Sequence, residues 1–150
     1  MWSASFSLLF CLFVFQTQAQ TVEVDIEIDA PSDRVWDCIT NPDYAKVLGA
    51  EFDEGAFVES DWEMGSQVHF KYEPDRLINS GTITKLVEEE LIQIDYDLGG
   101  FAYQEVYTIV RESEKSVLGL KAGPYTADFE AQQEVWGNWL TKVKEICEVD

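Results

Sequence analysis

Residues 22–36 read VEVDIEIDAPSDRVW and join two hydrophobic patterns of different period. From Val22 to Asp29, apolar and acidic residues alternate, which predicts a strand with one buried and one solvated face. Pro31, which suits the first turn of a helix, then precedes Val35 and Ile39 at helical spacing. The stretch therefore predicts a strand that leads directly into a helix.

The chain after this helix alternates between short breaks and strand-like segments. Asn41-Pro42 interrupts the helix, and a second short helix is expected at about residues 43–48. Between Ala56 and Ala122 the connections are short, which indicates antiparallel neighbours. Breaks are expected at residues 61–65, 74–81, 88–90, 99–100 and 112–114.

The last segment, residues 126–149, has the pattern of a long amphipathic helix. Phe129, Trp136, Leu140, Val143 and Cys147 follow one another at spacings of three, four and seven residues. Thr126 is a suitable residue to cap its start. We expect this helix to cover the apolar face of the antiparallel sheet.

Several short motifs resemble one known superfamily. Residues 28–36 resemble its opening segment, and Trp62-Glu63-Met64-Gly65 is similar to its W-x-x-G turn. Trp136-Gly137-Asn138-Trp139-Leu140 resembles the tryptophan-rich closing helix of two of its branches. This superfamily is the START-like or SRPBCC group with the helix-grip fold, and the two branches are the heat-shock ATPase activator-like and polyketide cyclase-like proteins. The resemblance covers nearly all of residues 22–149.

The resemblance implies the fold and the place of a site. We expect an α+β helix-grip fold, in which a curved antiparallel sheet of about seven strands wraps around the long C-terminal helix. Two short helices follow the first strand, and the START-like domain takes residues 20–150. Helix-grip domains commonly keep an apolar cavity between sheet and helix, and apolar pockets with a few polar groups bind small molecules. The residues expected to line it are Phe70, Tyr72, Ile94, Tyr96, Phe129, Trp136 and Leu140, with Tyr72 and Tyr96 as polar groups.

Two ionisable residues are candidates for acid–base chemistry or metal binding. Glu105, between Tyr103 and Tyr107, could act as an acid or base inside a closed pocket. The opposite interpretation, which we favour here, turns Ala102, Val106, Thr108 and Val110 inward and leaves Glu105 solvated. His69, the only histidine, alternates with Gln67 and Lys71 and is expected at the surface. With no second His or Cys at ligand spacing, we expect no metal and no cofactor.

The composition limits the partners. Acidic residues outnumber basic ones by 29 to 10, giving a net charge of −19. A field of this sign repels the phosphate backbone of nucleic acids and anionic bilayers. We therefore expect no nucleic acid as a partner, and the charge itself is explained by solubility.

The first residues predict export. Met1 to Gln20 holds no charged side chain, and the apolar run from Phe6 to Phe15 is too short to cross a bilayer. Small residues at positions 17 and 19 suit cleavage after Ala19. We expect a signal peptide at residues 1–19, a secreted product and no stable membrane insertion.

Removing this segment leaves Cys38 and Cys147. An even number of cysteines in an oxidising compartment is compatible with a disulfide, and two buried free thiols are the alternative. The family resemblance implies that the two residues lie close together, because the short helices support the distal part of the terminal helix.

Three functions fit the sequence. The first is a non-enzymatic carrier or sensor of a small apolar molecule, and the second is a polyketide cyclase/dehydratase-like enzyme that uses an inward-facing group such as Glu105. The third is a co-chaperone-like protein-binding module, which export from the cytosol disfavours. We prefer the first and keep the second as its alternative. The common hydrolase, nucleotide and metalloprotease motifs are missing from the sequence.

Overall fold

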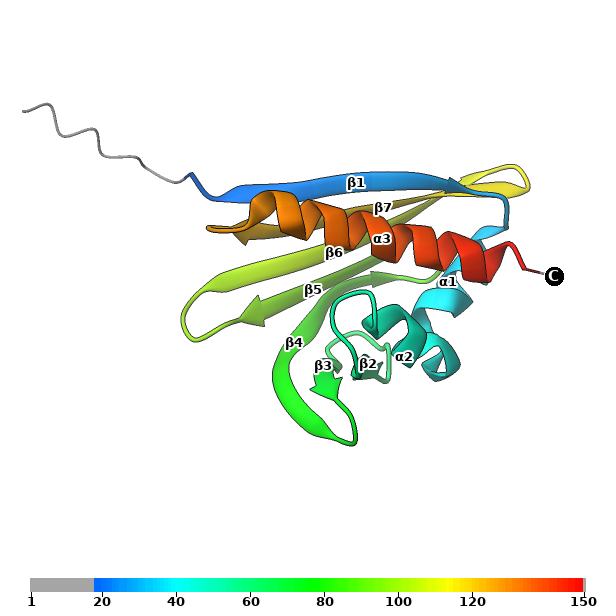
Figure 1. Cartoon of the computed structure of the whole chain (residues 1–150). Helices are drawn as coiled ribbons and strands as arrows, with labels where there is room; N and C mark the ends of the chain where they lie inside the picture. Colours follow the sequence, from blue (N-terminus) through cyan, green and yellow to red (C-terminus); the bar gives the residue numbers. More distant parts are fainter. Residues whose placement is uncertain (1–17, 150) are drawn as a thin grey trace, which may run out of the picture.

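The computed structural model describes residues 18–149, so that the expected signal peptide lies outside the described residues except for its last two positions. The described chain forms one antiparallel sheet and three helices (Figure 1). The expected α+β class is confirmed, as are the two short helices after the first strand and the long terminal helix. The strands are β1 (Gln20–Ile28), β2 (Ala56–Ser60), β3 (Gln67–Tyr72), β4 (Arg76–Val87), β5 (Leu91–Asp97), β6 (Ala102–Glu112) and β7 (Lys115–Tyr125). The helices are α1 (Ser32–Thr40), α2 (Pro42–Gly49) and α3 (Phe129–Cys147).

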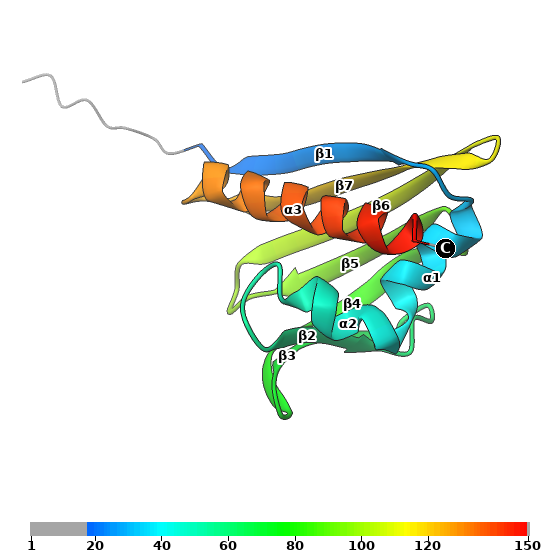
Figure 2. The same ribbon diagram turned by 45° about the vertical axis from the view of Figure 1, so that its right-hand side comes forward.

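The sheet has seven strands in the order β1-β7-β6-β5-β4-β3-β2. All neighbours are antiparallel, and the first and last strands of the chain pair with each other. Figures 1 and 2 show the sheet curling around α3, which lies along its inner face, while α2 lies close to β2. A cavity lies between the curled sheet, α3 and α2.

The alternating start of the chain becomes β1, as expected. Val22 and Ile28 are fully buried, while Glu23 and Glu27 are exposed and pair with lysines of β7. Exposed ion pairs of this kind contribute about 1 kcal/mol or less each. Burial of the apolar face against α3 is therefore the main reason that β1 holds its register.

The face of α3 that packs on the sheet is the one that its spacing predicts. Trp136, Leu140, Val143 and Cys147 are buried. The start of the helix differs from the expectation, however. β7 continues to Tyr125, and the helix begins at Phe129 after Asp128, whose backbone has a φ of 54°. Thr126 is therefore in the connection and does not cap the helix.

One expected break between strands was too long. We expected residues 74–81 to be a turn, whereas β4 already begins at Arg76 and pairs with β3 from there. Gly81 lies inside this strand, where the side chains of Ile94 and Tyr96 on β5 occupy the space that a Cβ would need. A Cβ at this position would lie 2.6 Å from Ile94 Cγ2. Glycine here serves close strand packing, which sequence alone does not distinguish from a turn.

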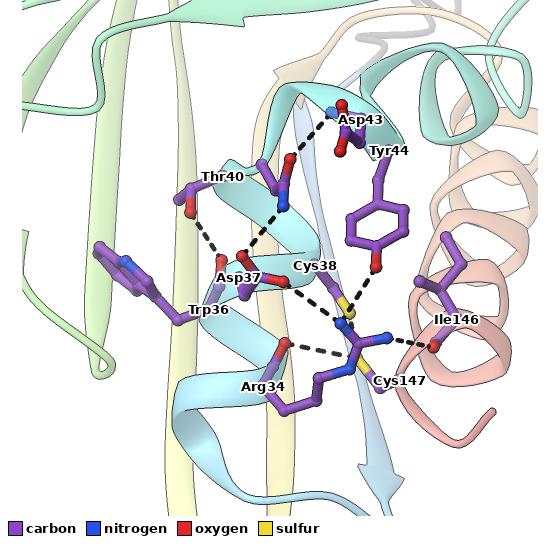
Figure 3. Close-up of polar contacts among 10 residues, drawn as sticks. Arg34, Trp36, Asp37, Cys38, Thr40, Asp43, Tyr44, Ile146 and Cys147 are labelled. Atoms are coloured by element: carbon purple, nitrogen blue, oxygen red, sulfur yellow. Dashed lines mark hydrogen bonds and ion pairs between the residues drawn. The ribbon is translucent and has the colours of Figure 1, made fainter. Parts of the chain in front are cut away.

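Arg34 of α1 ties the three helices together (Figure 3). Its Nη1 donates to Asp37 Oδ2 at 3.2 Å on the same helix and to the Tyr44 hydroxyl at 3.1 Å on α2. Its Nη2 donates to the carbonyl oxygen of Ile146 at 2.9 Å, near the end of α3. The guanidinium thereby satisfies a carbonyl of the last helical turn and fixes the position of α1 against α3.

Cys38 of α1 and Cys147 of α3 meet directly beneath this arginine (Figure 3). Both thiols are buried and free, and their Sγ atoms are 2.8 Å apart. The hydrogen bond from Cys147, assisted by the charge of Arg34, lowers the pKa of the Cys38 thiol against the effect of burial. The same contact, together with burial, raises the pKa of Cys147. The proximity that the resemblance implied is therefore present, and Cys38 is the more acidic thiol of the pair.

Candidate functional site

A cavity of about 610 Å³ lies between the sheet, α2 and the first half of α3. Its inner wall comes from buried residues such as Val68, Ile94 and Trp136. Its lining also includes exposed residues of the β5–β6 turn and of the β7–α3 connection, Phe101 and Thr126 among them. The cavity therefore reaches the surface, and its volume is within the range of small-molecule sites.

Four of the seven residues expected to line a cavity do so, namely Phe70, Ile94, Tyr96 and Trp136. The other three lie elsewhere, which corrects the expectation. Tyr72 is the last residue of β3, where its hydroxyl donates to Asp53 and its ring packs under Arg76. Phe129 is the first residue of α3 and packs against the core. Leu140 is buried one turn beyond Trp136 and is not part of the cavity lining.

Glu105 lines the cavity, and the expectation that it is solvated was wrong. The register of β5 and β6 gives the reason, since Ile94 pairs with Glu105 and Ile92 pairs with Tyr107. Residues paired across antiparallel strands point to the same face. Because Ile92 and Ile94 are buried on the inner face, Glu105 faces inward, and Val110, which we had turned inward, is 54% exposed.

Four tyrosines surround the Glu105 carboxylate, and we call Tyr96, Tyr103, Tyr107 and Tyr125 the tyrosine cluster. The Tyr107 hydroxyl donates to Glu105 Oε2 at 2.8 Å, and the Tyr96 hydroxyl approaches the same oxygen at 3.4 Å. The Tyr103 and Tyr125 hydroxyls are 2.6 Å apart. Trp136 Nε1 donates to the Tyr125 hydroxyl at 2.9 Å. The cluster thus links three strands and α3 around one carboxyl group.

Burial governs the ionisation of this group. Removal from water raises the pKa of Glu105 from 4.5 to about 7, against the lowering effect of hydrogen bonds from Tyr107, Tyr96 and Tyr103. Burial also raises the pKa of each tyrosine of the cluster above 10.0. The phenols therefore stay neutral at physiological pH, while Glu105 exchanges a proton there.

Replacing Glu105 by glutamine is expected to raise stability at pH 8 and to leave it almost unchanged at pH 4. Between pH 4.5 and 7 the folded chain holds a proton on Glu105 that the unfolded chain has lost, so the free energy of unfolding falls as pH rises. The difference between about 7 and 4.5 corresponds to about 3 kcal/mol at full ionisation. Urea unfolding of both proteins across this pH range measures the effect.

The matched control is Glu112→Gln, which removes an exposed carboxylate from the end of the same strand. It is expected to leave the wild-type pH dependence intact. Equal pH profiles for wild type and Glu105→Gln would show that Glu105 has an ordinary pKa in the folded chain.

One remaining candidate, His69, lies away from the cavity, and two lining residues were not expected from the sequence. His69 is half-buried and its Nδ1 is 2.7 Å from Ser80 Oγ of the neighbouring strand. Within residues 18–149, no group of three or more His, Cys, Asp or Glu side chains is arranged to hold a metal ion. Phe52 and Trp139 line the cavity although neither was expected there. Phe52 follows α2 in an irregular segment, where no periodic pattern indicates the direction of a side chain.

The curled sheet, the long terminal helix and the cavity between them define an SRPBCC-type protein with the helix-grip fold. A sequence profile for the family described as "Activator of Hsp90 ATPase homolog 1-like protein" matches residues 29–148. The match takes in most of the chain, and the chain belongs to this family. A search of curated proteins gave no significant match.

Many solved structures share the fold. Protein CV1439 from Chromobacterium violaceum aligns with a TM-score of 0.69 at 20% identity, over 87% of this chain and 99% of that one. The Aha1 dimer from Colwellia psychrerythraea aligns with a TM-score of 0.68 at 14% identity, over 87% and 97%. CalU16 from Micromonospora echinospora gives 0.64 at 17% identity, over 87% and 75%. At these identities the similarity concerns the fold alone.

Proposed function

We propose that this protein binds a small apolar molecule in the cavity and acts as a non-enzymatic carrier or sensor. The observation that carries the proposal is an open cavity of about 610 Å³ with walls that are mainly apolar and aromatic. An apolar ligand gains roughly 25 cal/mol for each Å² that it removes from water. Micromolar binding corresponds to about −8 kcal/mol, and association costs about 4 kcal/mol or more in lost freedom, so the ligand has to bury roughly 500 Å² or more of apolar surface.

Filling the mouth of the cavity is expected to weaken binding. Ala45 of α2 lines the cavity and is half-buried, so Ala45→Trp would place an indole in the ligand space. We expect this variant to bind Nile red, a neutral apolar dye, about tenfold or more weakly than wild type. Fluorescence titration measures the affinity.

Val47→Trp is the matched control, since Val47 is on the same helix but 42% exposed and outside the lining. It is expected to bind the dye like wild type. Absence of dye binding by folded wild type, or equal binding by Ala45→Trp, would contradict the proposal. Mass spectrometry of organic extracts of the purified protein identifies any ligand carried from the cell.

A second candidate function is acid–base catalysis, because Glu105 lies in the cavity with a pKa of about 7. A general acid or base is most effective when its pKa is near the working pH. The two functions differ in the fate of the ligand. A carrier returns it unchanged after incubation, whereas a cyclase or dehydratase returns a product of altered mass.

A co-chaperone role, to which the family description refers, is the third candidate. We favour ligand binding because export directed by the signal peptide proposed for residues 1–19 would separate the mature chain from a cytosolic chaperone. The described residues contain no helix that is long and apolar enough to span a membrane.

A further inference from the structure

The carboxyl group in the cavity has one oxygen that is left for a ligand. The Tyr107 and Tyr96 hydroxyls both approach Glu105 Oε2, at 2.8 and 3.4 Å. Within residues 18–149, no hydrogen bond to Oε1 is found. Every buried side-chain oxygen in this range has a hydrogen-bond partner, so an oxygen without one must be open to the cavity. Oε1 therefore faces the cavity as an acceptor.

The charged groups of the cavity wall differ in their partners. Lys46 at the mouth pairs with Glu73, and Glu59 pairs with Lys71. Glu105 has neutral hydroxyls as hydrogen-bond donors and no ion-pair partner in the described part of the chain. A buried carboxylate without a cation is costly, and a cationic ligand group would remove this cost.

Aromatic rings enclose the same end of the cavity. The ring centroids of Tyr96 and Tyr103 are 5.7 Å apart, those of Tyr103 and Tyr125 are 5.5 Å apart, and those of Tyr107 and Trp136 are 6.2 Å apart. The faces of such rings attract organic cations, most strongly where water is excluded. The net charge of −19 adds a long-range field that concentrates cations and repels anions at the mouth.

From these contacts we infer that the ligand is a lipophilic amine whose ammonium group bonds Glu105 Oε1 within the tyrosine cluster, while its apolar body fills the outer cavity. The inference rests on the proposed function and specifies its ligand class. A fatty acid would bring a second carboxylate against Glu105, which like-charge repulsion disfavours. A neutral alcohol can donate one hydrogen bond but gains no charge attraction.

The pH dependence of binding follows from the groups that face Glu105. Burial raises the pKa of Tyr96 on β5, Tyr103 and Tyr107 on β6 and Tyr125 on β7, so these phenols are neutral between pH 6 and 8. Trp136 on α3 does not titrate, and Lys46 and Glu59 at the wall are held in ion pairs with Glu73 and Lys71. Glu105 is therefore the group that ionises between pH 6 and 8, and amine affinity is expected to rise over this range.

Calorimetric titration with decylamine, decanol and decanoate tests the inference, because the three probes share one chain and differ in head group. At pH 8 we expect decylamine to bind wild type about tenfold or more tightly than the other two. Glu105→Gln is expected to lose both the preference for decylamine and the rise in decylamine affinity between pH 6 and 8. Since the variant is expected to be more stable at pH 8, unfolding does not account for the loss.

Equal affinity of the three probes, tighter binding of decanoate, or an unchanged amine preference in Glu105→Gln would overturn the inference. Nile red binding separates it from the proposed function. If the dye binds and decylamine has no preference, only the ligand class is wrong. If neither the dye nor any of the probes binds, the proposed function itself fails.

Discussion

Trp136→Ala is expected to lower the free energy of unfolding by about 3–5 kcal/mol, the usual cost of removing a buried indole. Trp136 is 3% exposed, and its ring packs edge to face on Phe52 with centroids 4.7 Å apart. It also packs against Trp139 and Tyr107, with centroid distances of 5.8 and 6.2 Å. Its loss joins new empty volume to the cavity and leaves the Tyr125 hydroxyl without its indole donor.

Urea unfolding of Trp136→Ala beside Trp136→Phe separates packing from hydrogen bonding. The phenylalanine variant keeps a ring and loses the donor to Tyr125, so we expect a loss of about 1–2 kcal/mol. If the alanine variant lost less than about 1 kcal/mol, Trp136 would not be the residue that joins α3 to the cavity wall.

Oxidation of Cys38 and Cys147 to a disulfide is expected to stabilise the chain by up to about 5 kcal/mol, the value that the loop-entropy relation gives for the long loop between them. The two residues are 109 positions apart, and their thiols are already in contact. The oxidant would be diamide, which accepts the two hydrogens released by the thiols and is itself reduced to a hydrazine. The lowered pKa of Cys38 favours it as the attacking thiolate.

Intact mass without reductant shows the loss of the two hydrogens, and thermal unfolding shows the gain in stability. Cys147→Ala is the control, because it retains Cys38 but cannot form this bond. A gain of the same size in this variant, or no change of mass in wild type, would contradict the prediction.

The fold was predictable because its main elements have clear periods. The alternation of residues 22–29 and the helical spacing of residues 136–147 correspond to β1 and α3. The ends of elements were less predictable. Thr126 is a good capping residue, but the left-handed backbone of Asp128 and the length of β7 place the start of α3 at Phe129.

The site was predictable only in part, since β6 carries plausible inward residues on both faces. Valines at 106 and 110 suggested one face, and the tyrosines at 103 and 107 suggested the other. The pairing of Ile94 with Glu105 turns the face with the tyrosines inward. This pairing depends on the turn between β5 and β6. A strand whose two faces are both partly apolar has no single register by sequence alone.

The edge strand β1 has a further consequence for the behaviour of the protein in concentrated solution. An exposed sheet edge is a template on which another chain can add a strand and begin aggregation. Glu23, Asp25 and Glu27 follow one another along the outer face of this edge. A second copy adding its own β1 would set one acidic row beside another, and like charges on adjacent strands repel. The residues that give β1 its solvated face are therefore expected to oppose the addition of a strand from a neighbouring molecule.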